Sequence, residues 1–127
     1  MQVVLTLAER NEEQAGLQLS QFTQQVDAEV EQLRQLDDYA AQYLNTYSER
    51  KTAVRAQELI AYSGFIQRLG EARKEQQVRL ERLQLQLERL RQVWRIAHQK
   101  TESIKDLIAR LQQEENALLD KRLQKEM

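Results

Sequence analysis

The sequence contains no proline, no cysteine and only three glycines in its 127 residues. Tight turns and phosphate-binding loops depend on glycine and proline for their backbone angles, and here only Gly16, Gly64 and Gly70 can supply glycine. Without cysteine the chain has no disulfide, no thiolate metal ligand and no cysteine nucleophile. We therefore do not expect a compact all-β fold or a glycine-loop nucleotide-binding fold.

Aromatic residues are also scarce, at 6%, and the uninterrupted apolar runs are only a few residues long. A helix that spans a bilayer needs about 20 apolar residues. The first seven residues lack the basic start and the long apolar stretch of a secretory signal. These absences predict a cytoplasmic location.

Apolar residues recur with a seven-residue repeat in two long stretches. From Leu5 to Tyr47, alternating steps of three and four residues meet an apolar residue at eleven of thirteen positions, and from Leu59 to Arg122 at fourteen of nineteen. Repeats of this length are typical of left-handed coiled coils. They predict an all-α chain with a single coiled-coil domain over residues 1–127. Its helices would cover about residues 3–47 and 55–123, with a connection over about 48–54, where the repeat changes phase.

The two predicted helices carry opposite charge. Residues 1–47 contain two Arg and eight acidic residues, a balance of −6, whereas residues 48–127 contain seventeen Lys or Arg and twelve acidic residues, a balance of +5. Charges that flank an apolar seam select coiled-coil partners, so the first helix should attract the second and repel its own copies. We expect an antiparallel intramolecular hairpin that is a monomer when free. In the register that matches side-chain sizes, facing residue numbers add up to 109, which sets Tyr47 against Tyr62 and Ala15 against Trp94.

In this register the N-terminal end of the first helix, near Leu5, lies opposite Ile104. The part of the second helix after Ile104 would therefore have no internal partner. This tail is still amphipathic, with Leu119 and Leu123 close to the apolar side. The residues that form the apolar side of the tail are Leu107, Ile108, Leu111 and Leu118. An apolar stripe without an internal partner predicts an external one.

Groups for catalysis or metal binding are few. His98 is the only histidine, and the pattern supplies it with no nucleophile or orienting group, so it is interpreted as structural or solvent-exposed. Basic residues between Arg73 and Arg95 alternate with acidic ones at ion-pair spacing, and the pI of 5.9 lies far below that of nucleic-acid-binding domains. We expect no enzyme activity, no cofactor, no metal site and no nucleic-acid partner.

One row of residues has two interpretations. Phe65, Leu69, Ala72 and Gln76 follow one another at steps of four, three and four, which places them on one helix face, and Phe65 lies just outside the seam between Gly64 and Gly70. The row could widen the core near the connection. It could equally present an exposed aromatic anchor to a partner protein.

The same stretch carries a resemblance to a known family. The run from Tyr62 to Leu69, with Ala72, Gln76 and then Trp94 twenty-nine residues after Phe65, resembles the FliJ family of flagellar export proteins. The segment from Leu7 to Ala15 and the two-helix plan are similar as well, so the resemblance covers essentially the whole chain. The residue at the place of Gln76 varies in the family, and the end at Met127 is early for it.

The resemblance implies an antiparallel coiled coil, similar to the central stalk of rotary ATPases, in the cytoplasm and peripherally associated with the inner membrane at the flagellar base. It implies three partners: the hexameric export ATPase, whose pore would receive both ends of the hairpin; the cytoplasmic domain of the export gate; and export chaperones. The gate would bind the row from Phe65 to Gln76, and the tail is the candidate ATPase contact. A stalk of a related injectisome and a self-associating scaffold remain as alternatives.

Overall fold

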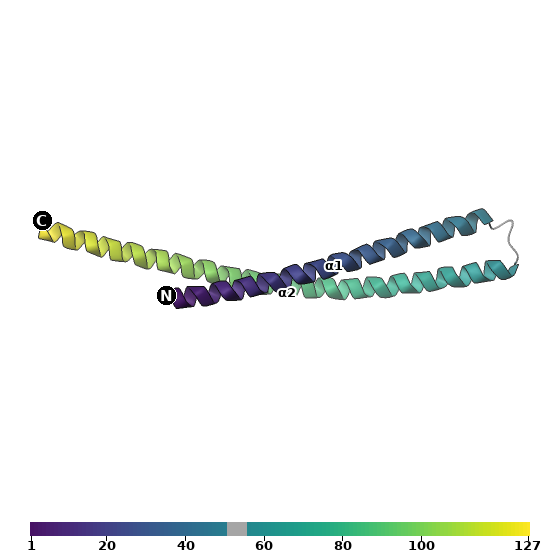
Figure 1. Ribbon diagram of the computed structural model, residues 1–127, viewed down its shortest axis with the longest axis horizontal. Helices are drawn as coiled ribbons and strands as arrows, with labels where there is room; N and C mark the ends of the chain where they lie inside the picture. The colour runs from purple at the N-terminus through teal and green to yellow at the C-terminus, as the bar shows by residue number, and fades with distance from the viewer. Residues whose placement is uncertain (51–55) are drawn as a thin grey trace. The chain divides into compact units, whose positions relative to one another are not determined.

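The computed structural model of the chain describes residues 1–50 and 56–127, with the backbone alone at Arg50. These residues form two long helices, α1 (Gln2–Arg50) and α2 (Ala56–Glu126), and no strand occurs in either described range (Figure 1). The all-α prediction is therefore confirmed. Residues 48–50, predicted as part of the connection, belong to α1, and residues 51–54 lie outside the described residues.

Local sequence explains the length of the helices. Gln, Glu, Leu, Arg and Ala dominate the chain and all favour helix, and no proline removes a backbone donor. None of the described residues has a positive φ, so the backbone stays helical through Gly16, Gly64 and Gly70. The seven-residue apolar repeat then gives each helix one face to bury.

The chain divides into two compact units. The terminal unit consists of residues 1–20 and 89–127, and the middle unit consists of residues 21–88. Each contains a segment of α1 and a segment of α2. In both units the two segments pack side by side and run in opposite directions, which confirms the helical hairpin.

Burial follows the apolar repeat closely. All thirteen repeat positions between Leu5 and Tyr47 are buried or half-buried, and so are those of α2 from Leu59 to Ile108 apart from Arg73. The most deeply buried apolar side chains are small or medium in size. They are Ala8 and Ala15 in the terminal unit and Val26, Ala40 and Leu87 in the middle unit. A narrow seam of this kind is what two helices packed at coiled-coil spacing can bury.

Candidate functional site

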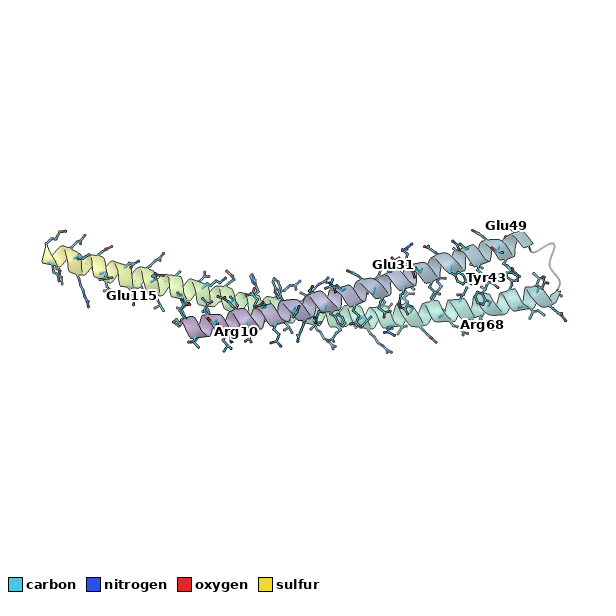
Figure 2. All side chains as sticks on the ribbon, in the orientation of Figure 1. Arg10, Glu31, Tyr43, Glu49, Arg68 and Glu115 are labelled. Atoms are coloured by element: carbon cyan, nitrogen blue, oxygen red, sulfur yellow. The ribbon has the colours of Figure 1, made fainter. Side chains whose placement is uncertain are left out.

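Five aromatic rings gather in the middle unit, toward the ends of α1 and α2 that precede and follow residues 51–55. Tyr47 lies against Tyr62 with ring centroids 5.5 Å apart, the pair that the register predicts. Tyr43 lies between the two helices, with its centroid 5.0 Å from Tyr62 and 4.3 Å from Phe65 (Figure 2). Tyr39 meets Phe65 edge to face at 6.2 Å. Offset and edge-to-face contacts at these distances are favourable.

This cluster decides how Phe65 lies in the free chain. The ring is half-buried against Tyr39 and Tyr43, so Phe65 widens the core of the middle unit, as the first of the two interpretations has it. The rest of the row, Leu69, Ala72 and Gln76, is also half-buried. The row therefore forms one edge of the seam, with a part of each side chain open to solvent. Its role in binding a partner stays a prediction.

Acidic residues of α1 meet basic residues of α2 in the middle unit, as the charge balance predicts. Arg73 Nε donates to Asp37 Oδ1 at 2.5 Å. Glu29 occupies a seam position with a side chain only 13% exposed, where its Oε1 lies 3.2 Å from Arg79 Nη2 and its Oε2 accepts a hydrogen bond from the Gln76 amide. The half-buried carboxylate of Glu29 is thus matched by groups from the opposite helix.

A second ion-pair group lies on the exposed surface of α1 alone. Arg34 donates to Glu31 one turn before it and to Asp38 one turn after it. The hydrogen bond from Arg34 lowers the pKa of Glu31 below its usual value, and the same bond to Glu31 raises the pKa of Arg34. Pairs at this spacing support a helix locally and specify no partner.

The terminal unit holds a polar group inside its seam. Nδ1 of His98 lies 2.6 Å from Oε1 of Glu12, and the His98 ring stacks on Trp94 with centroids 5.0 Å apart. The hydrogen bond from His98 holds the pKa of Glu12 below its usual value. One turn further along, Thr101 is fully buried, and its hydroxyl donates to the Ala97 carbonyl at 3.1 Å. The sequence analysis interpreted His98 as structural or solvent-exposed, and no pattern in the sequence pointed to Glu12 as its partner.

Close packing in the terminal unit also involves Gly16. A Cβ built on Gly16 would lie 3.5 Å from both Cδ1 and Nε1 of the Trp94 ring. Trp94 therefore packs over Gly16 of α1, the residue next to Ala15, which the register sets against Trp94. The large ring and the small residues complement each other in size, as a close-packed seam requires.

The register predicts that α2 loses its internal partner near Ile104, and in the structure the last half-buried residue comes one turn later, at Ile108. Ile104 and Ile108 are half-buried, whereas every residue from 109 to 127 is exposed. No part of α1 lies beside the yellow end of α2 in Figure 1, and Glu115, labelled in Figure 2, lies on this free segment. Three of the four apolar tail residues are open to solvent, with Leu107 41%, Leu111 43% and Leu118 61% exposed, whereas Ile108 is half-buried. From residue 109 onward the tail is exposed at every position and stays helical to Glu126.

In residues 1–50 and 56–127, no group of three or more His, Asp or Glu side chains is arranged to hold a metal ion. Neither helix, within those ranges, has a segment long and apolar enough to cross a membrane. The features that the described residues do contain are a coiled-coil seam, ion pairs and exposed apolar side chains.

These features define a class: an antiparallel two-helix coiled coil with exposed apolar surface for partners. The chain matches the family model described as Flagellar FliJ protein over residues 1–127. It belongs to the FliJ family, whose members are non-catalytic export components. It is therefore a component of flagellar type III protein export. A search of curated proteins and a search of solved structures each gave no match.

Proposed function

We propose that this protein is the central stalk of the flagellar export ATPase, with the tail of α2 as its contact inside the ATPase ring. The observation that carries the proposal is the apolar side of the tail, which no other described residue covers from residue 109 onward. Exposed apolar side chains in a regular row fit the packing of a partner protein. A hexameric ring cannot supply a single axial element from its own identical subunits, whereas this chain can.

Coupling requires that the stalk bind the states of the ATPase differently, because a ligand shifts only an equilibrium whose states it distinguishes. The two helices differ in sequence and in net charge. A stalk without rotational symmetry would therefore contact the six subunits unequally. Unequal contacts are the physical requirement for coupling in this arrangement.

A test of the tail uses single substitutions on exposed side chains. Leu111→Glu and Leu118→Glu should abolish most of the stimulation of ATP hydrolysis by the export ATPase and leave the melting temperature of the free chain unchanged. Leu85→Glu is the control, because Leu85 is an exposed leucine of α2 in the middle unit, and its 65% exposure is close to the 61% of Leu118. Full stimulation by both tail variants would contradict the proposal.

We propose further that the row Phe65, Leu69, Ala72 and Gln76 binds the cytoplasmic domain of the membrane export gate, which would place the protein in the cytoplasm at the inner membrane of the flagellar base. Two observations support this role: the four residues lie on one face of α2, and they are partly exposed beside the aromatic cluster. Leu69→Ala should weaken gate binding by about 1–3 kcal/mol, as for an interface anchor. Isothermal titration against the gate domain measures this, and unchanged affinity would remove Leu69 from the interface.

Escort of export chaperones belongs to the same proposal and rests on family membership alone. The family match favours the flagellar system over a related injectisome. The scaffold alternative has its own test, since self-association depends on concentration. Light scattering over a wide concentration range should give the mass of one chain, and a mass that rises with concentration would favour the scaffold.

A further inference from the structure

A groove runs along one side of the terminal unit, between α1 and α2. It has a volume of about 440 Å³, and all of its lining residues belong to the terminal unit. From α1 the groove is lined by Ala8, Asn11, Gln14, Ala15 and Gln18, and from α2 by Val93, Ile96, Ala97 and Lys100. It is separate from both the tail beyond residue 108 and the row from Phe65 to Gln76.

The apolar part of the groove is open to solvent. Val93 is 51% exposed and Ile96 is 64% exposed, although both lie close to the seam. Beside them the buried methyl groups of Ala8 and Ala15 form the bottom of the groove. The groove is open there because the short alanine side chains do not fill the space above the seam. Two branched apolar side chains next to this open space form a site for larger apolar side chains from outside.

The spacing of the lining residues fits a helix as the occupant. The lining residues of α1 follow at steps of three, with Gln14 and Ala15 adjacent, and those of α2 lie within two turns of one face. Both walls therefore follow helix ridges that run in the direction of the groove. A third helix can lay apolar side chains from every third or fourth position into such a groove, as in three-stranded coiled coils.

Charge specifies the chemistry of that helix. Lys100 is the only ionisable side chain that lines the groove, and the other polar lining groups are the neutral amides of Asn11, Gln14 and Gln18. Lys100 is exposed, and the side chains one turn before and after it, at Ile96 and Ile104, are apolar. The acidic residues of α1 in this unit do not line the groove, and Glu12 is paired with His98 in the seam. The groove is thus apolar with positive charge at its rim.

We propose that this groove is a docking site for an amphipathic helix of another protein, one whose apolar face is flanked by Asp or Glu. Its apolar residues would cover Val93 and Ile96, and a flanking carboxylate would pair with Lys100. Complementary charge favours such a helix over a basic one. This site is independent of the proposed contacts with the ATPase and the gate.

The test uses the full chain and two labelled synthetic helices of about 20 residues, a length sufficient for partial helicity in water. Both carry Leu and Ile at every third and fourth position, and they differ only in flanking Glu or flanking Lys. Fluorescence anisotropy should show at least tenfold tighter binding of the Glu helix. Ile96→Glu should reduce that affinity at least tenfold and Lys100→Gln about threefold, whereas Leu85→Glu, an equally exposed site in the middle unit, should not change it.

The side-chain amide of Asn11, which lines the groove, reports where the helix binds, independently of its affinity. The chain has three Asn residues, so their NMR signals can be assigned by substitution. The signal of Asn11 should move when the Glu helix is added, and those of Asn45 and Asn116 should stay in place. Equal binding of the two helices, no binding of either, or a stationary Asn11 signal would overturn the proposal. So would sedimentation showing a dimer that Ile96→Glu dissociates, because the occupant would then be a second copy of this chain.

Discussion

Gly64 and Gly70 destabilise α2 without any packing benefit in the free chain. Both lie inside the helix with helical backbone angles, and a Cβ built on either would meet nothing within 4 Å. Glycine in a helix interior costs about 1 kcal/mol relative to alanine. Since no described side chain opposes the added methyl, Gly64→Ala and Gly70→Ala should each raise the free energy of unfolding by about 1 kcal/mol.

The gain should appear as a higher melting temperature, by about 4 °C for each substitution in a chain of this size. Circular dichroism at 222 nm during heating and during urea titration measures it. Ala61→Gly is the matched control, because Ala61 is an exposed position of the same helix and should lower stability by about the same 1 kcal/mol. If both alanine variants are no more stable than the parent while Ala61→Gly is less stable, the argument from open space around the glycines is wrong.

The Gly64→Ala and Gly70→Ala variants also test whether a partner requires glycine at these two positions. Gly64 precedes the proposed gate-binding row and Gly70 lies within it, between Leu69 and Ala72, and packing among the described residues gives no reason for either glycine. If the export gate approaches the α2 backbone there, the added methyl groups should weaken gate binding although they stabilise the free protein. Titration of the stabilised double variant against the gate domain tests this, and unchanged affinity would show that the partner does not approach these glycines closely.

Three further outcomes are expected from the packing. Leu87→Ala should lower the free energy of unfolding by about 2–3 kcal/mol, because Leu87 is among the most buried side chains of the middle unit, and urea titration measures it. Tyr43→Ala should cost about 2 kcal/mol, since it removes the ring between Tyr62 and Phe65, and a smaller loss than for Ala61→Gly would contradict the cluster's role. The pKa of Glu12 is lower in the folded chain than its unfolded value of 4.5, so Glu12 contributes stability above that value and loses the contribution as the pH falls through the folded pKa. Glu12→Gln should therefore reduce the fall of the free energy of unfolding at acid pH, which urea titrations between pH 3 and 7 measure.

The sequence could predict the seam but only part of the surface. The seven-residue repeat fixes which side of each helix is buried, because burial follows helix periodicity, and the Tyr47–Tyr62 contact shows that the register was also readable. Phe65 was ambiguous, since it lies outside the repeat and its ring is covered both by Tyr43 of the repeat and by Tyr39, an exposed residue that the repeat does not include. The Glu12–His98 contact and the groove beside Ile96 depend on the rotation of one helix against the other to within one residue. Apolar periodicity does not carry that information.

Polar residues inside the seam determine how the two helices can move. Glu29 is held by Gln76 and Arg79, and Glu12 is held by His98, and every one of these partners comes from the opposite helix. A slip of one heptad within either unit would leave a half-buried carboxylate without its partner, and an unpaired charge in that position is strongly disfavoured. Pairing α1 with a second α1 would likewise set acidic residues against each other. The seam therefore selects one antiparallel register, and we expect α1 and α2 within each unit to respond to a partner as a pair, without sliding along one another.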